Sequence, residues 1–363
     1  MSEQNYIFHS LHPERDCKAY LLADPASGEA AIVDPRFDYT RRYLGELETR
    51  GLTLKYAIDT HTHADHLSGA DRLRNITGCK VAMGDKTGSK VADLKLADGE
   101  KLALGQLELT ALHTPGHTPD SICIVAPGRV MTGDTLFIGT AARTDFMGGS
   151  SAQLFDSFRR IEALGLETEV WPGHDYNGKQ SSTIAAEAGS NPPFMDKTRD
   201  ELVARLAMKG PLPANMAEML AFNSEAGTPE DKIIHPKDVA RLGVPGRDYT
   251  CLDVRYDDEF AAGRIEGAKQ IVLTELKERL GELEGLPRPI LSVCKAGVRA
   301  TVAMMMARRA GMSDWLLLEG GMEEWSAGGL PMVADDGVEP AVIVSKLAVG
   351  GSCAAGGGSC AAG

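Results

Sequence analysis

Side chains that could bind a metal ion are concentrated in one short stretch of this sequence, residues 60–66 (THTHADH). Three histidines and one aspartate lie close together there: His61, His63, Asp65 and His66. Imidazole and carboxylate groups are ligands that suit zinc or iron at neutral pH. Packing these residues as ordinary core residues would instead bury several polar groups without partners, which is costly. The spacing therefore favours a metal site.

Further candidate ligands lie downstream of this stretch. Each follows a strand-like apolar run and sits in a loop rich in glycine or proline: His117 in HTPGHTPD, Asp134 after RVMTG and His174 in WPGHD. Loops of this kind can direct several side chains at one point. We interpret His113 as part of its loop and not as a ligand. The sequence thus predicts one metal centre assembled from distant segments.

A second reactive group is predicted at Cys294, in the loop CKAGVR between an apolar run at 289–293 and a helix expected over 301–310. Backbone N–H groups of such a loop can converge on the sulfur, and the helix N-terminus adds partial positive charge. Lys295 and Arg299 add formal charge, so we expect a lowered pKa and a thiolate that can hold a persulfide. Gly297 and Arg299 do not fit ordinary core packing. A structural cysteine and a phosphatase, with Arg299 holding phosphate, are the alternatives.

The elements that must position these groups alternate between strands and helices. Strands are expected at 19–23, 30–34, 55–60, 80–83, 107–112 and 122–126, and helices at 38–50 and 151–164. Residues 180–230 are predicted to be mostly helical and connecting. From about Lys232 a new strand–loop–helix alternation begins, which is typical of a doubly wound parallel sheet.

Length and composition limit the classes of protein to consider. A chain of 363 residues predicts two domains, and a net charge of −13 argues against nucleic acid or an anionic membrane as partner. The start has no signal-peptide pattern, and no apolar run is long enough to span a membrane. Seven scattered cysteines, an odd number, favour a reducing compartment over a disulfide framework. We therefore expect a cytoplasmic protein.

The ligand set, in this order, resembles the metallo-β-lactamase fold over about residues 1–225, which implies a four-layer αββα sandwich. Residues 232–335 resemble a rhodanese domain, through DVR at 253–255, the CKAGVR loop and GGM at 320–322. We therefore expect an α/β protein with domains at 1–228 and 229–335. Residues 336–363 are expected to form a flexible tail, in which GGSCAAG occurs twice.

This combination resembles the persulfide dioxygenase–rhodanese fusions of bacterial sulfide metabolism. The resemblance implies oxidation of glutathione persulfide by O₂ to sulfite and glutathione, at a single non-haem Fe(II) per chain. The implied iron ligands are His61, His117 and Asp134. Arg143, in a Gly-rich loop over 139–149, would pair with a glutathione carboxylate, and Tyr176 is a weaker candidate for a glutathione contact.

For the rhodanese half, the resemblance implies sulfur transfer between thiosulfate and glutathione through a persulfide on Cys294. Lys295, Gly297 and Arg299 are the expected substrate contacts, and sulfite is the other partner. Cys251 also lies in a strand, and we interpret it as a core residue. The direction of transfer, the preferred thiol and whether the chain forms a homo-oligomer stay open.

The candidate ligands leave a second interpretation open. His63, Asp65, His66 and His174 are either contacts around a single iron or ligands of a second metal. With Asp134 as a bridge they would complete the binuclear zinc set of the fold's hydrolases. The alternative functions are therefore a glutathione thioester hydrolase, resembling hydroxyacylglutathione hydrolase and fused to a sulfurtransferase, or a non-catalytic sulfur carrier or persulfide sensor.

Overall fold

The computed structural model describes residues 5–11, 17–145, 148–207, 216–225, 227 and 230–335. The chain divides into two compact units, which are described separately. The first comprises Met1–Ile233 with Met304–Met312, and the second Ile234–Ala303 with Ser313–Gly363. Within the described ranges, no helix has the length and apolar character needed to cross a membrane. The duplicated tail sequence lies outside the described residues.

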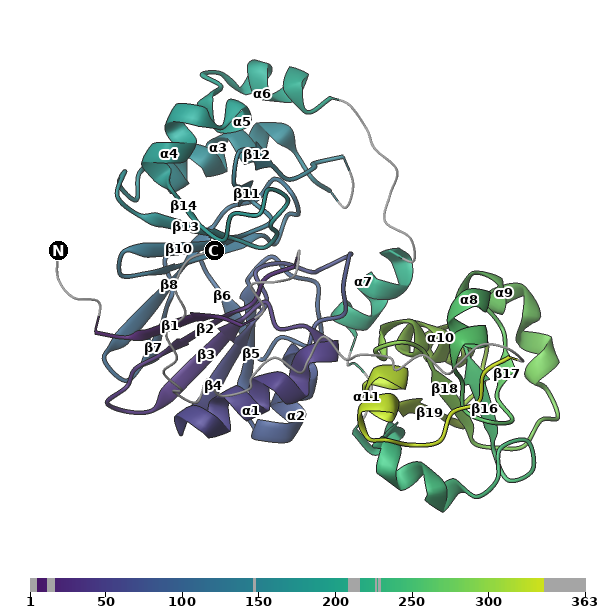
Figure 1. Ribbon diagram of the computed structural model, residues 1–363. Coiled ribbons are helices and arrows are strands. Elements are labelled where there is room, and N and C mark those ends of the chain that lie inside the picture. The colour runs from purple at the N-terminus through teal and green to yellow at the C-terminus, as the bar shows by residue number, and fades with distance from the viewer. Residues whose placement is uncertain are drawn as a thin grey trace, which may run out of the picture. The chain divides into compact units, whose positions relative to one another are not determined.

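The first unit is built on two six-stranded sheets (Figure 1). The first sheet has the order β1 (Ile7–Ser10), β2 (Tyr20–Ala23), β3 (Glu29–Val33), β4 (Thr53–Ile58), β5 (Lys80–Gly84) and β6 (Leu94–Leu96). β1, β2 and β3 pair antiparallel, whereas β3 to β6 are parallel. The loops that follow β3 and β4 therefore leave the sheet at the same edge.

The second sheet has the order β14 (Ser182–Thr183), β13 (Glu169–Pro172), β10 (Arg129–Gly133), β9 (Ile122–Ala126), β8 (Leu107–His113) and β7 (Lys101–Leu104). β10 and β13 are parallel, and the other neighbours in this sheet are antiparallel. A small antiparallel ribbon, β11 (Leu136–Phe137) with β12 (Thr140–Ala141), follows β10.

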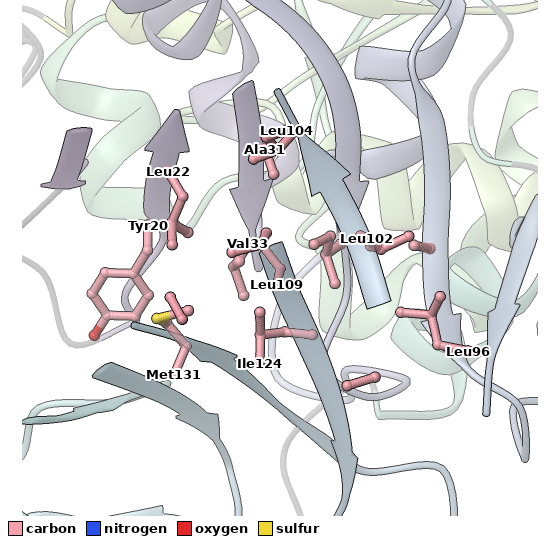
Figure 2. Packing of buried hydrophobic residues seen from close by; sticks show 14 of the residues in the cluster. Tyr20, Leu22, Ala31, Val33, Leu96, Leu102, Leu104, Leu109, Ile124 and Met131 are labelled. Atoms are coloured by element: carbon pink, nitrogen blue, oxygen red, sulfur yellow. The ribbon is translucent and has the colours of Figure 1, made fainter. Parts of the chain in front are cut away.

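The two sheets pack face to face through one apolar core (Figure 2). Tyr20, Leu22 and Val33 of the first sheet meet residues of the second, among them Leu109 and Met131. The sequence produces this core by alternation, because successive strand side chains point to opposite faces. In β7, for example, the leucines are buried while Lys101 and the alanine between them are exposed.

Helices cover the outer faces of both sheets (Figure 1). Next to the first sheet lie α1 (Thr40–Arg50), preceded by a 3-10 turn at Phe37–Tyr39, and α2 (Ala70–Thr77). Next to the second lie α3 (Ser151–Glu162), α4 (Ile184–Ser190), α5 (Pro192–Met195) and α6 (Arg199–Arg205). Leu154, Phe158 and Ile161 of α3 form a second core with Val130 and Val170. The expected αββα sandwich is thus confirmed. α7 (Met216–Ser224) and a 3-10 turn at Glu230–Lys232 complete the described part of this unit.

The second unit has a five-stranded sheet in the order β15 (Ile233–Ile234), β19 (Trp315–Leu318), β18 (Ile290–Val293), β16 (Thr250–Asp253) and β17 (Lys269–Gln270). The pairs among β16, β17, β18 and β19 are all parallel, as predicted. Its helical segments are Pro236–Leu242, α8 (Asp257–Ala262), Leu273–Glu275, α9 (Leu276–Arg279), Leu280–Leu283, α10 (Val298–Arg309) and α11 (Gly321–Ala327). Met322 and Trp325 of α11 pack with Leu291 and Val293 in its core.

Most expected elements are present with shifted ends. The most informative shift concerns the helix after Cys294, because α10 begins at Val298 and not at residue 301. Arg299 therefore lies in the first turn of this helix and not in the preceding loop. Cys251 lies in the core, as predicted.

Candidate metal centre and cysteine loop

The THTHADH stretch is fixed at the edge of the first sheet by an aspartate from the neighbouring strand end. Asp34 directly follows β3, and its carboxylate accepts hydrogen bonds from Thr60 N (2.7 Å) and Thr60 Oγ1 (2.9 Å). Its Oδ1 also lies 3.2 Å from His63 Nε2. Because β3 and β4 are parallel, the residues after them meet at one edge, where this network locks the start of the loop.

Three of the candidate ligands, His61, His117 and Asp134, lie close together. His61 Nε2 lies 4.0 Å and His117 Nε2 3.8 Å from Asp134 Oδ2. One ligand atom from each of the three residues lies within 4.8 Å of the others. Both distances to Asp134 are shorter than about twice a metal–ligand bond of 2.0–2.2 Å, so the three atoms fit around one ion. Two imidazoles and one carboxylate form a donor set that suits Fe(II) and leaves positions open for other ligands.

Hydrogen bonds orient the two imidazoles of this group. His117 Nδ1 lies 2.8 Å from the Arg143 carbonyl oxygen, which can only accept, so Nδ1 carries the proton and Nε2 the lone pair. His61 Nδ1 lies 3.1 Å from Thr60 Oγ1, which in turn donates to Asp34. Such contacts fix ring orientation and tautomer in metal sites.

A glycine brings Asp134 close to the histidines. Gly133 has a φ of +47°, a backbone conformation that residues with a side chain rarely adopt. A β-carbon at this position would also collide with the Thr60 side chain. The end of β10 can therefore approach the THTHADH stretch closely enough for Asp134 to reach it.

The other four candidate ligands surround this group. His174 Nε2 lies 3.4 Å from Asp134 Oδ2 and 3.3 Å from Asp65 Oδ2. His66 Nδ1 lies 3.2 Å from Asp65 Oδ1. Among the described residues, His63 Nδ1 and His66 Nε2 are buried with no hydrogen-bond partner. Buried polar atoms without partners are rare and costly, so these nitrogens suit metal ligands better than core residues.

Burial and neighbouring charges both shift the pKa values of residues in the centre. Burial alone would raise the pKa of Asp134, but His174, His61 and His117 hold that pKa well below its usual range. Burial, with the neighbouring His63, lowers the pKa of His61 to about 3. Burial raises the pKa of Asp59 to about 6. A neutral imidazole beside an ionised carboxylate is the state that binds a cation.

A cavity of about 470 Å³ opens beside the ligands, lined by His117, Asp134, His174, Arg143 and Tyr176 among others. The Arg143 guanidinium makes two hydrogen bonds to the Asp145 carboxylate, at 2.7 and 2.9 Å. The Tyr176 ring stacks on His174 at a centroid distance of 5.5 Å. Arg143 and Tyr176 thus both line the cavity beside the candidate metal ligands. Phe146, from the same loop as Arg143, lies outside the described residues.

Three residues that contact the centre were missed in the sequence: Asn223, Cys17 and Asp34. Asn223 of α7 is buried; its Nδ2 donates to the carbonyls of His63 and His66, both at 2.8 Å, and its Oδ1 accepts from Ser68 N. Cys17 lies with its Sγ 3.7 Å from Asp65 Oδ2. Asn223 has no local sequence signal, whereas Asp34, at a strand end like Asp134, could have been found by its position.

The Cys294 loop is built mainly from backbone. Cys294 follows β18 and is buried, and the Gly297 N–H donates to its Sγ at 3.1 Å. Gly297 has a φ of +98°, which only glycine adopts readily. Burial raises the pKa of Cys294, against the lowering effect of Ala300, Arg299, Ala296 and Gly297. The expected net lowering of this pKa is therefore wrong, because the sequence does not show how completely the sulfur is buried.

The two cations beside Cys294 differ in their surroundings. Arg299 makes two hydrogen bonds to the Glu259 carboxylate, at 2.6 and 2.7 Å, and lies 5.5 Å from the Tyr256 ring. Lys295 is more exposed, and its Nζ lies 4.0 Å from Glu323 Oε1. Arg299 is thus held by a carboxylate, with which any anion at this guanidinium would compete.

Comparison with known proteins agrees with both halves of this description. Residues 12–174 match the model of the metallo-beta-lactamase superfamily, and residues 239–328 that of the rhodanese-like domain. The chain is 37% identical over 177 residues to the human mitochondrial persulfide dioxygenase ETHE1, covering 48% of this chain and 69% of the relative. It is 32% identical over 248 residues to the beta-lactamase hydrolase-like protein of Agrobacterium fabrum, and the match spans only 57% of each chain.

The crystal structure of ETHE1 from Myxococcus xanthus is also similar, with 36% identity and a TM-score of 0.59. That match covers 61% of this chain and 100% of the other. The chain therefore belongs to the metallo-β-lactamase superfamily. It has persulfide dioxygenases among its relatives and carries a rhodanese-like domain after the lactamase-like one, which confirms the predicted resemblance to such fusions.

Proposed function

We propose that this chain oxidises glutathione persulfide with O₂ to sulfite and glutathione, at one Fe(II) held by His61, His117 and Asp134. The observation that carries the proposal is the convergence of these three side chains beside a cavity that Arg143 also lines. We further propose domain limits of 1–228 and 229–335, and action in the cytoplasm.

The lactamase-like domain would bind and orient the substrate. Arg143 is suited to a glutathione carboxylate, because its planar guanidinium can make two parallel hydrogen bonds. The Asp145 carboxylate now occupies that fork and would be displaced or shared. Tyr176 forms another part of the wall. Bound Fe(II) would supply the chemistry that makes O₂ reactive towards the persulfide sulfur.

The rhodanese-like domain would transfer sulfur through Cys294. The Cys294 thiolate attacks the outer sulfur of thiosulfate, the S–S bond breaks and sulfite leaves, which gives a persulfide on the cysteine. A glutathione thiolate then takes the outer sulfur, and the Cys294 thiolate is released. The Gly297 N–H donates to Sγ, while Arg299 and Lys295 supply positive charge for the anion. The reverse direction uses the same contacts.

The test measures iron content and O₂ uptake on glutathione persulfide for the wild type, Asp134→Ala and Asp98→Ala. Asp98 is a control, since its carboxylate pairs with Arg160 and accepts from the His113 N–H, and neither partner is a candidate ligand. Asp134→Ala should lower iron affinity and O₂ uptake by more than about 100-fold, because even indirect contacts to metal ligands are worth 10–100-fold. Asp98→Ala should behave like the wild type. Wild-type protein that holds iron but consumes no O₂ with persulfide contradicts the proposal.

A binuclear glutathione thioester hydrolase is the second candidate. It is favoured by the partnerless nitrogens of His63 and His66, together with His174 beside Asp134. The same purified protein would then hold two zinc ions and hydrolyse a glutathione thioester without consuming O₂. The non-catalytic carrier or sensor would show neither activity.

A further inference from the structure

One wall of the cavity beside the candidate metal ligands is a short hairpin. The ribbon of β11 and β12, with the two residues after it, supplies Phe137, Thr140, Ala141, Ala142 and Arg143 to the lining. Each strand of this ribbon has only two residues. A two-stranded ribbon of this kind is not stable on its own, so other segments must hold it in place.

A buried glutamate of α4 holds the turn of this hairpin. Glu187 is only 2% exposed, and its Oε2 accepts hydrogen bonds from the Gly139 N–H at 2.9 Å and from Asn191 Nδ2 at 2.7 Å. Its Oε1 accepts from the Ser182 hydroxyl. Burying a carboxyl group is costly unless donors surround it. One of the three donors that stabilise Glu187 is thus the backbone of the ribbon.

A buried asparagine, the residue before α5, holds the two strands of the hairpin. Asn191 Nδ2 lies 3.0 Å from the carbonyl oxygens of Phe137 and Thr140, which face each other across the ribbon. Carbonyl oxygens can only accept, so the nitrogen and not the oxygen of this amide points at the ribbon. Asn191 Oδ1 is buried and has no hydrogen-bond partner among the described residues. Buried polar atoms without partners are rare and costly, so this amide is poorly suited to a role in packing alone.

Asn177 holds the remaining residue of the turn. Its Nδ2 donates to the Ile138 carbonyl at 2.8 Å. Each residue of the hairpin over 137–140 therefore makes a hydrogen bond to the side chain of Asn177, Glu187 or Asn191. These three side chains do not belong to the described lining of the cavity. They can act on a bound substrate only through the ribbon.

We propose that Glu187 and Asn191, assisted by Asn177, are positioning residues that fix the ribbon and so determine how tightly the cavity binds the glutathione part of the substrate. The inference rests on the proposed function, which supplies the substrate class. The ribbon carries side chains of the cavity wall but none of the candidate metal ligands. Loss of its position should therefore raise KM more than it lowers kcat. A pair that only stabilised the fold would instead change the folded fraction, and hence the apparent kcat, without changing KM.

The experiment measures the binding of S-methylglutathione, a thioether without the persulfide sulfur, to the iron-loaded full chain by calorimetry in the absence of oxygen. KM and kcat for O₂ uptake on glutathione persulfide are measured on the same samples. Glu187→Ala and Asn191→Ala should each weaken binding of the thioether about tenfold and raise KM by a similar factor, because each removes three hydrogen bonds. The kcat per folded, iron-loaded chain should change by less than about threefold.

Two variants serve as matched controls. In Glu187→Gln the amide oxygen can accept the two hydrogen bonds of Oε2, while the amide nitrogen can donate to the Ser182 hydroxyl oxygen. This variant should bind the thioether within about twofold of the wild type, since no hydrogen bond is lost. Asp196→Ala removes another buried carboxyl group of the same unit, which pairs with Arg205 of α6 and not with the ribbon. It should leave KM and thioether affinity unchanged even where it lowers the unfolding midpoint.

Unchanged thioether affinity and KM in both alanine variants would overturn the inference, as would a Glu187→Gln protein that binds as weakly as Glu187→Ala. A wild type that does not bind the thioether would overturn the substrate class. Should neither alanine variant fold, Asn177→Ala replaces them, because Asn177 is exposed. It should raise KM about threefold through loss of one hydrogen bond, and an unchanged KM would contradict the inference. A wild type that binds the thioether but consumes no O₂ with persulfide would contradict the proposed function and leave this inference intact.

Discussion

The metal centre and the Cys294 loop reach their chemistry by opposite routes. The metal centre is assembled from side chains that lie between His61 and His174 in the sequence. Contacts from other segments hold two of these stretches, from the Arg143 carbonyl to His117 and from the Asp34 carboxylate to Thr60. The Cys294 site is one continuous loop whose groups are backbone N–H donors and the first turn of α10. The metal centre depends on distant supports. The Cys294 loop depends mainly on its local conformation, although the N–H groups of Met322 and Glu323 in α11 donate to its Cys294 and Lys295 carbonyls, at 2.8 and 2.9 Å.

The two sites also differ in how charge is balanced. At the metal centre, ionised Asp134 is surrounded by imidazoles, so removal of one partner leaves a buried charge. At Cys294 the sulfur is buried, and burial outweighs the nearby positive charge. The metal centre thus suits a cation. Cys294 becomes a good nucleophile only at a pH at which its thiol is deprotonated.

The largest effect should come from separating the two sites with one substitution. Serine nearly matches cysteine in size, but its hydroxyl stays protonated near neutral pH and cannot form a persulfide. Cys294→Ser should therefore abolish sulfur transfer between thiosulfate and glutathione. O₂ uptake on thiosulfate plus glutathione should vanish with it, while uptake on supplied glutathione persulfide should persist.

Cys251→Ser is a control for this experiment, since Cys251 is a buried core cysteine in the neighbouring strand. It should keep both routes if the variant folds, as judged by its circular dichroism. Uptake from thiosulfate plus glutathione in Cys294→Ser would show that the proposed division of labour is wrong. Loss of uptake on supplied persulfide, with iron retained, would show that the two sites share one step.

The next effect tests whether the cavity beside the metal ligands binds the substrate. Arg143→Ala should raise KM for glutathione persulfide about 10- to 100-fold, from loss of a charge-assisted contact worth about 1.5–3 kcal/mol. Because Asp145 competes for the same guanidinium, Asp145→Asn should lower KM. Steady-state O₂ uptake measures both. Equal KM values in all three proteins would remove Arg143 from substrate binding.

Sequence reasoning indicated which candidate ligands lie close together better than it indicated the residues that support them. The THTHADH spacing and the strand ends before Asp134 and His174 predicted which side chains meet, since parallel strands bring such residues to one edge. Asn223 holds the same loop from 160 residues beyond His63. A buried asparagine in a helix has no pattern that reveals this role. The fold classes could be predicted from strand–helix alternation and from the two resemblances, because both rest on local sequence patterns.

At the Cys294 loop, the sequence predicted local contacts but not the effects of distant elements. Its sequence predicted that backbone N–H groups of the loop would reach the sulfur, and the Gly297 N–H does so, because a local motif specifies local geometry. It did not predict the direction of the pKa shift, which depends on burial by elements from the whole unit. Nor did it show Glu259, whose carboxylate holds Arg299 from 40 residues upstream.

A smaller effect tests the dependence of the metal centre on distant supports. Asn223→Ala removes three hydrogen bonds to the loop 63–68 and leaves every candidate ligand in place. Iron affinity should fall about tenfold, as for other indirect supports of metal ligands. Competition with a chelator measures this affinity. Ser190→Ala is a control, since Ser190 is exposed in part and bonds only within α4. Unchanged iron affinity in Asn223→Ala would mean that the loop holds its own shape.

The smallest effect concerns a support that the Cys294 site receives from another segment, the Glu259 carboxylate. Glu259→Gln removes the carboxylate that neutralises Arg299, so the guanidinium should bind thiosulfate more tightly. A partly exposed ion pair is worth at most about 1 kcal/mol, so KM for thiosulfate should fall no more than about fivefold.

The same substitution also predicts the direction in which the pH dependence of the reaction should shift. The pKa of Cys294 is raised by burial and lowered by Arg299, so a less neutralised Arg299 should lower it. The rising limb of kcat/KM against pH should then move to lower pH. Glu275→Gln, which removes a carboxylate from Arg279 in the same unit, should change neither quantity. A higher KM in Glu259→Gln, or a rising limb that moves to higher pH, would contradict this expectation. Glu259 would then position Arg299 for the substrate instead of competing with the substrate. The Cys294 site would in that case depend on a distant support, as the metal centre does.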